Sequence, residues 1–73
     1  MKLSIKTQKQ IERIVNEEWE RANDDINLLI TRIEDRIAKH TKAANTKESR
    51  HELYHTRVQV YADDLVLKLV HSR

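Results

Sequence analysis

Residues 11–37, IERIVNEEWERANDDINLLITRIEDRI, decide the fold class of this chain. Apolar side chains recur in this stretch at steps of three and four residues, the spacing of one stripe along an α-helix. The stripe consists of Ile11, Val15, Trp19, Ala22, Ile26, Leu29, Ile33 and Ile37. Because the stripe keeps its phase throughout, we expect one helix over about residues 7–40, roughly 50 Å long at a rise of 1.5 Å per residue.

The middle and the start of this expected helix carry further signals. Asn23, Asp24 and Asp25 are poor helix formers and good N-caps, so they leave open a kink or a break near Asn23. Thr7 with Gln10 fits a capping box at the helix start. The sequence contains no glycine and no proline, the residues that most often turn a chain or end a helix. Their absence favours the uninterrupted helix.

A second helix is expected over about residues 50–71, after a loop at about 41–49. The apolar pattern stops between His40 and Thr46, and Ser49 with Glu52 fits another capping box. One face of this helix is apolar and consists of Tyr54, Val58, Tyr61, Leu65 and Leu69. The sequence therefore predicts a single all-α domain over residues 1–73, an antiparallel two-helix hairpin.

A second apolar set on the same helix predicts self-association. Leu53, Val60 and Leu67 recur every seven residues, and one hairpin partner can cover only one face. The longer first helix would also overhang the second and offer Val15 and Trp19 to a neighbour. With 73 residues, 38% of them hydrophobic and none of them cysteine, a monomer would bury a small core without a disulfide. We expect a homo-oligomeric helical bundle whose interface includes these five side chains.

Residues 51–55, HELYH, match the H-E-x-x-H signature of zinc peptidases. Histidines four apart on a helix point the same way and can share a metal, and His40 at the end of the first helix could join His51 and His55. A peptidase also needs a cleft and a strand that aligns the substrate, which a helical hairpin lacks. Two hypotheses remain for these histidines. They bind zinc without peptidase activity, or they bind no cofactor, and the sequence favours the second.

Basic residues gather around the expected turn. Acidic residues outnumber arginines between Ile11 and Arg36, whereas lysine and arginine outnumber acids between Ile37 and Arg57. Lys47, Arg50 and Arg57 belong to this basic segment and could bind phosphate. The pattern disfavours duplex DNA as a partner, because helices this long, without a short glycine-bearing turn, do not form a helix-turn-helix motif.

The predicted second helix also resembles that of a known protein family. The resemblance lies in Arg50, Thr56-x-Val58-Gln59, Ala62, Leu65 and Lys68. It is similar to a phage family of small hairpin proteins that counter CBASS-type defence by oligomerising and sequestering cyclic oligonucleotide signals. The resemblance implies that Arg50 and Thr56 contact a nucleotide, which extends the expected anion site to Lys47, Arg50, Thr56 and Arg57.

No set of nucleophile, base and orienting residue of an enzyme is apparent in the sequence. We therefore expect a non-enzymatic binding module, an inhibitor or adaptor of the kind carried by phages and mobile elements, that assembles with itself and with a protein partner. The alternative is a phage anti-defence protein that sequesters cyclic oligonucleotides. No apolar run approaches the length of a membrane span and no signal peptide opens the sequence, so a cytoplasmic location without membrane contact is expected.

Overall fold

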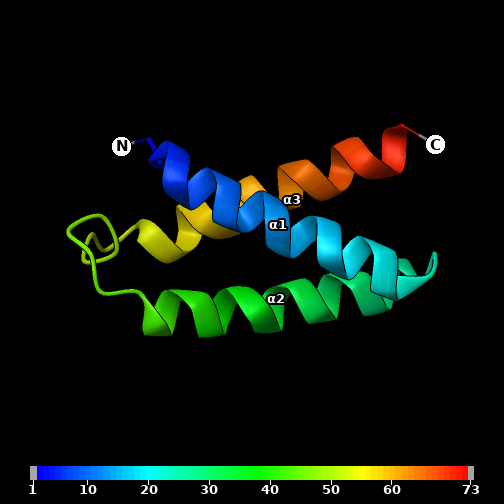
Figure 1. Cartoon of the computed structure of the whole chain (residues 1–73), viewed down its shortest axis with the longest axis horizontal. Coiled ribbons are helices and arrows are strands. Elements are labelled where there is room, and N and C mark those ends of the chain that lie inside the picture. The colour runs from blue at the N-terminus through cyan, green and yellow to red at the C-terminus, as the bar shows by residue number, and fades with distance from the viewer. Residues whose placement is uncertain (1, 73) are drawn as a thin grey trace.

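Three helices of equal length make up the fold (Figure 1). The computed structural model describes residues 2–72, in which α1 spans Ile5–Ala22, α2 spans Ile26–Ala43 and α3 spans Tyr54–His71. Each helix contacts the other two, and α1 and α3 cross each other on the same side of α2. The all-α prediction is confirmed, since the described residues contain helices, turns and loops and no strand.

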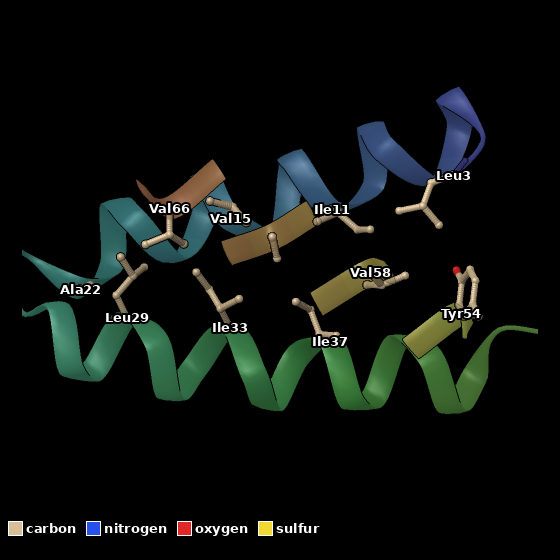
Figure 2. Close-up of a cluster of buried hydrophobic side chains, with 11 residues drawn as sticks. Leu3, Ile11, Val15, Ala22, Leu29, Ile33, Ile37, Tyr54, Val58 and Val66 are labelled. Carbon is tan, nitrogen blue, oxygen red and sulfur yellow. The ribbon is translucent and has the colours of Figure 1, made fainter. Parts of the chain in front are cut away.

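The core is built from the apolar stripe that the sequence displays. Ile11, Leu29, Ile37 and Val58 are completely buried, and the side chains of all three helices interdigitate along the axis of the bundle (Figure 2). The other buried hydrophobic residues are Leu3, Ile14, Val15, Ala22, Ile33, Tyr54, Ala62 and Val66. At roughly 25 cal/mol per Å² of apolar surface, this burial is the main stabilising contribution.

The expected long helix breaks at residues 23–25, so the two-helix hairpin is wrong and a three-helix bundle replaces it. Asn23 and Asp24 adopt left-handed backbone conformations, with φ of 49° and 72°. Asp25 then caps α2, because its Oδ1 accepts a hydrogen bond from the amide of Leu28 at 3.0 Å. Asparagine and aspartate tolerate the left-handed region better than other residues with a Cβ, and here they take the place of glycine.

Two predicted helix starts also shift. α1 begins at Ile5, where the Ser4 hydroxyl accepts from the Thr7 amide, so Thr7 is not the cap. α3 begins at Tyr54 rather than at residue 50, and its N-cap, Leu53, has no side-chain capping bond. Ser49 does not cap α3 because its hydroxyl and amide pair with Thr46 in a separate turn. The loop therefore covers residues 44–53 instead of 41–49.

The break removes the overhang that was expected to dock on a neighbour. Val15 is 1% exposed and lies in the core of its own chain, and Trp19 is half-buried against the same core. Because α1 now lies antiparallel to α2 and reaches α3, these two side chains already have intramolecular partners. The expected interface therefore loses Val15 and Trp19 as surface contacts.

Replacing the α2 cap tests the importance of the break. Asp25→Ala removes the acceptor for the Leu28 amide and should lower the free energy of unfolding by about 1 kcal/mol. Asp25→Ser keeps a capping oxygen and should stay within about 0.5 kcal/mol of the wild type. Urea unfolding followed by circular dichroism measures both variants. Equal stability of the alanine and serine variants would show that the cap does not matter.

Candidate functional site

The outer face of α3 carries a row of exposed apolar side chains, here called the α3 stripe: Leu53, Val60 and Leu67. They are 44%, 61% and 55% exposed. Val60 lies two residues before the buried Ala62, which is about 200° around the helix axis, so the α3 stripe points away from the core. Leu53 belongs to the row because its carbonyl accepts from the Arg57 amide at 2.9 Å in helical register.

A hollow borders the α3 stripe on each side. One, of about 320 Å³, lies between α2 and α3 and is lined by Ile30, Ile33, Val66 and Leu67, with Glu34 and Asp63 among the same lining residues. The other, of about 590 Å³, lies between the start of the chain and α3. Its lining residues are Lys2, Leu3, Gln8, Thr56, Arg57, Val60, Tyr61 and Asp64. Ile30 is 41% exposed, so the first hollow extends the apolar surface of Leu67 onto α2.

Polar residues flank the α3 stripe in an ordered way. Arg57 and Asp64 follow Leu53 and Val60 by four residues and lie along one edge. Thr56 and Asp63 follow the same two residues by three and lie along the other edge. One edge therefore carries a positive charge, Arg57, and a negative charge, Asp64, seven residues apart. The other edge carries the hydroxyl of Thr56 and the carboxylate of Asp63.

The three histidines of the hypothetical zinc site do not form a ligand set. His51 lies in the turn before α3, so it does not share a helix face with His55, and its Nδ1 accepts from the Leu53 amide. Nε2 of His40 is 3.2 Å from the Tyr54 hydroxyl. Within residues 2–72, no group of three or more histidine, aspartate or glutamate side chains could hold a metal ion.

The expected anion residues divide into two places. Thr56 and Arg57 line the larger hollow together with Lys2, which the sequence did not single out. Lys47 and Arg50 lie in the loop of residues 44–53, where Arg50 donates to the Asn45 side chain at 3.2 Å. Neither Lys47 nor Arg50 lines the larger hollow, so the four expected anion residues do not form one site.

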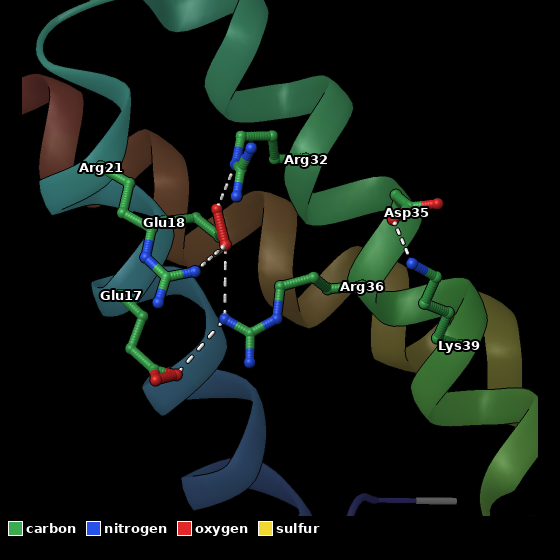
Figure 3. A network of polar contacts seen from close by, with 7 residues as sticks. All are labelled: Glu17, Glu18, Arg21, Arg32, Asp35, Arg36 and Lys39. Atoms are coloured by element: carbon green, nitrogen blue, oxygen red, sulfur yellow. Dashed lines mark hydrogen bonds and ion pairs between the residues drawn. The ribbon is translucent and has the colours of Figure 1, made fainter.

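A charged network that the sequence reasoning missed joins α1 to α2 (Figure 3). The side chain of Glu18 is completely buried, and it accepts from Arg32 Nε at 2.5 Å and from Arg36 Nη1 at 3.4 Å. Arg21 lies 3.8 Å from the same carboxylate, and Arg36 also reaches Glu17 at 3.3 Å. Glu18 lies between Val15 and Ala22 in the apolar stripe, which is the signal that could have revealed its burial.

The hydrogen bond from Arg32 is the main cause that holds the pKa of Glu18 below its ordinary value, and it outweighs the opposing effect of burial. A second carboxylate, Glu48, accepts from the Thr7 hydroxyl and from the Ser4 amide at 2.6 Å. These hydrogen bonds lower the pKa of Glu48, and the bond from the Thr7 hydroxyl has the largest effect. The loop before α3 is thereby attached to the start of α1.

Comparisons with protein-family models, with curated proteins and with solved structures give no match for this chain. No helix within residues 2–72 has both the length and the apolar character that crossing a bilayer requires. The function is therefore inferred from the surfaces and charges of the chain itself.

The Glu18 network predicts how stability depends on pH. A carboxyl group with a lowered pKa stabilises the fold fully above its ordinary pKa, about 4.3, and this stabilisation is lost as pH falls through the lowered value. Glu18→Gln should lower the free energy of unfolding at pH 7 by about 1–3 kcal/mol. The difference from the wild type should shrink on acidification below about pH 4.

The control is Glu34→Gln, at an exposed position on α2. Its stability should follow that of the wild type across the same pH range. Urea unfolding at a series of pH values measures all three proteins. A Glu18→Gln deficit that stayed constant down to pH 2 would mean that the charge of Glu18 does not support the fold.

Proposed function

We propose that this protein is a non-enzymatic helical binding module, an inhibitor or adaptor, that works as a self-assembled oligomer. The observation that carries the proposal is the α3 stripe. Three large apolar side chains at seven-residue spacing remain 44–61% exposed on the face opposite the core. Exposed apolar residues are common singly, but a heptad row along one helix is the pattern of a helix-packing surface.

The small core supports the same proposal. Ile5 and Leu28 are also exposed, at 69% and 43%, so apolar side chains outside the α3 stripe also remain in contact with water. Association would bury the α3 stripe and supply contacts that a domain of this size lacks. Lys47 and Arg50 are exposed in the loop before the α3 stripe, so they would remain available to a further partner.

Charge placed at the centre of the stripe tests self-assembly. Val60→Glu should raise the dissociation constant of the oligomer at least about 100-fold, because an unpaired carboxylate would be buried. Ala38→Glu puts the same charge on the exposed face of α2 and should leave assembly unchanged. Sedimentation equilibrium at micromolar concentrations measures both. A wild type that sediments as a monomer in this range would overturn the proposal.

A second candidate function is the capture of a cyclic oligonucleotide. It is supported by the larger hollow, where Lys2, Thr56 and Arg57 come together beside Tyr61. A lysine and an arginine can pair with phosphates, and an aromatic ring can stack on a base. Asp64 lines the same hollow and opposes an anion, so we rank this function below self-assembly.

Calorimetry against cyclic di- and trinucleotides tests this candidate. Arg57→Ala should weaken binding at least about 10-fold, because charge-assisted contacts dominate such affinity, and binding by the wild type should fall steeply with salt. Arg50→Ala is the matched control, since Arg50 does not line the hollow. The absence of binding to every nucleotide tested, with the protein folded, would eliminate this function.

A further inference from the structure

We propose that the partner of the α3 stripe is a second copy of this chain, bound through a two-fold antiparallel contact centred on Val60. The inference rests on the proposed self-assembly and specifies the surface, the orientation and the residue pairs. Around such an axis, Val60 meets Val60 of the second copy. Leu53 meets Leu67 of the second copy, because both lie seven residues from the centre, about 10 Å along the helix.

The charges along the stripe favour this orientation. In an antiparallel pair, each edge of one helix faces the same edge of the other. Arg57 then faces Asp64 of the second copy, and Asp64 faces Arg57, so the two-fold axis generates two opposite-charge contacts. On the other edge, the Thr56 hydroxyl can donate to Asp63 of the second copy. Each flanking residue thus finds a complementary group.

A parallel pair would bring like groups together. The edge with Arg57 and Asp64 would then face the edge with Thr56 and Asp63. Asp64 would lie beside Asp63 of the second copy, and Arg57 would lie beside Thr56 with no acidic partner at its level. Asp63 and Asp64 are both exposed in the single chain, so parallel association would bring carboxylates together that are otherwise surrounded by water. Such contacts between like charges are unfavourable. Asp64 already pairs with Lys68 at 3.2 Å, but both side chains are more than half exposed, so exchange of this ion pair costs little.

The smaller hollow supplies a place for a side chain of the second copy. It lies beside Leu67, the position that Leu53 of the second copy approaches, and Ile30, Ile33 and Val66 line it. A leucine entering this hollow would contact α2 and α3 together. The contact would therefore extend beyond a single helix pair and would cover Ile30 as well.

Cysteine cross-linking tests the geometry, because the natural sequence has no cysteine to interfere. Val60→Cys should form a disulfide dimer under mild oxidation, since the two copies meet at this residue. Leu53→Cys and Leu67→Cys should each fail to cross-link alone. Each is about 21 Å from its own counterpart, whereas a disulfide needs Cα atoms within about 7 Å. An equimolar mixture of these two variants should cross-link to each other.

The control is Ala38→Cys on the exposed face of α2, which should not cross-link. A charge exchange gives an independent readout by sedimentation. Arg57→Asp alone and Asp64→Arg alone should each raise the dissociation constant about 3- to 10-fold, and the double variant should restore it.

The cross-linking and sedimentation results distinguish a failure of the antiparallel interface from a failure of self-assembly. Self-cross-linking of Leu53→Cys at the rate of Val60→Cys would indicate a parallel pair and overturn the inference. An oligomer in sedimentation that cross-links at none of the three stripe positions would leave self-assembly standing and overturn this interface. A monomeric wild type would overturn both.

Discussion

The reversal of the chain at Asn23–Asp25 is the constraint on which the rest of the structure depends. Two consecutive left-handed residues fold the apolar stripe back on itself, so that its two halves face each other as α1 and α2. The stripe then forms two walls of a core, and α3 supplies the third. Without the reversal, the same residues would line one side of a rod about twice as long and would need another chain to cover them.

The buried Glu18 makes this arrangement specific. Apolar contacts are non-directional, and an amphipathic hairpin could pack in more than one register. Glu18 accepts from Arg32 and lies close to Arg36, one helical turn further along α2, so its carboxylate fixes how α1 lies against that helix. A shift of one residue would leave this charge buried without its partners, which is costly. At the opposite end of the bundle, Glu48 performs a similar task between the loop and the start of α1.

These two sets of contacts determine which surface remains for function. Once α1 covers the inner side of α3, Val58, Ala62 and Val66 are buried and the opposite face is left to solvent. The α3 stripe lies on this face, beside hollows whose walls come from α2 and from the first residues of the chain. The candidate binding surface is thus a consequence of how the core is filled, and it combines residues that are far apart in sequence.

Periodicity alone determined much of the fold. It identified most of the buried stripe and the heptad row of Leu53, Val60 and Leu67, because these depend on helical spacing, which is local. The predicted face of α3 is confirmed in part: Tyr54 and Val58 are buried, but Ala62 and Val66 complete the buried face, and Tyr61, Leu65 and Leu69 are only partly buried. Periodicity could not detect the reversal, since Ala22 and Ile26 are four residues apart whether they lie on one helix or on both sides of a tight turn. The absence of glycine also favoured an uninterrupted helix. That prediction was wrong because Asn23 and Asp24 adopt the left-handed conformation in place of glycine. Only the tertiary structure decided that Val15 is internal, that Glu18 is buried among arginines, and that Arg57 lines a hollow with Lys2 while Arg50 does not. These features depend on contacts between residues that are distant in sequence. The place of Glu18 in the apolar stripe is a local signal of burial, but helical spacing does not say which arginines surround the carboxylate.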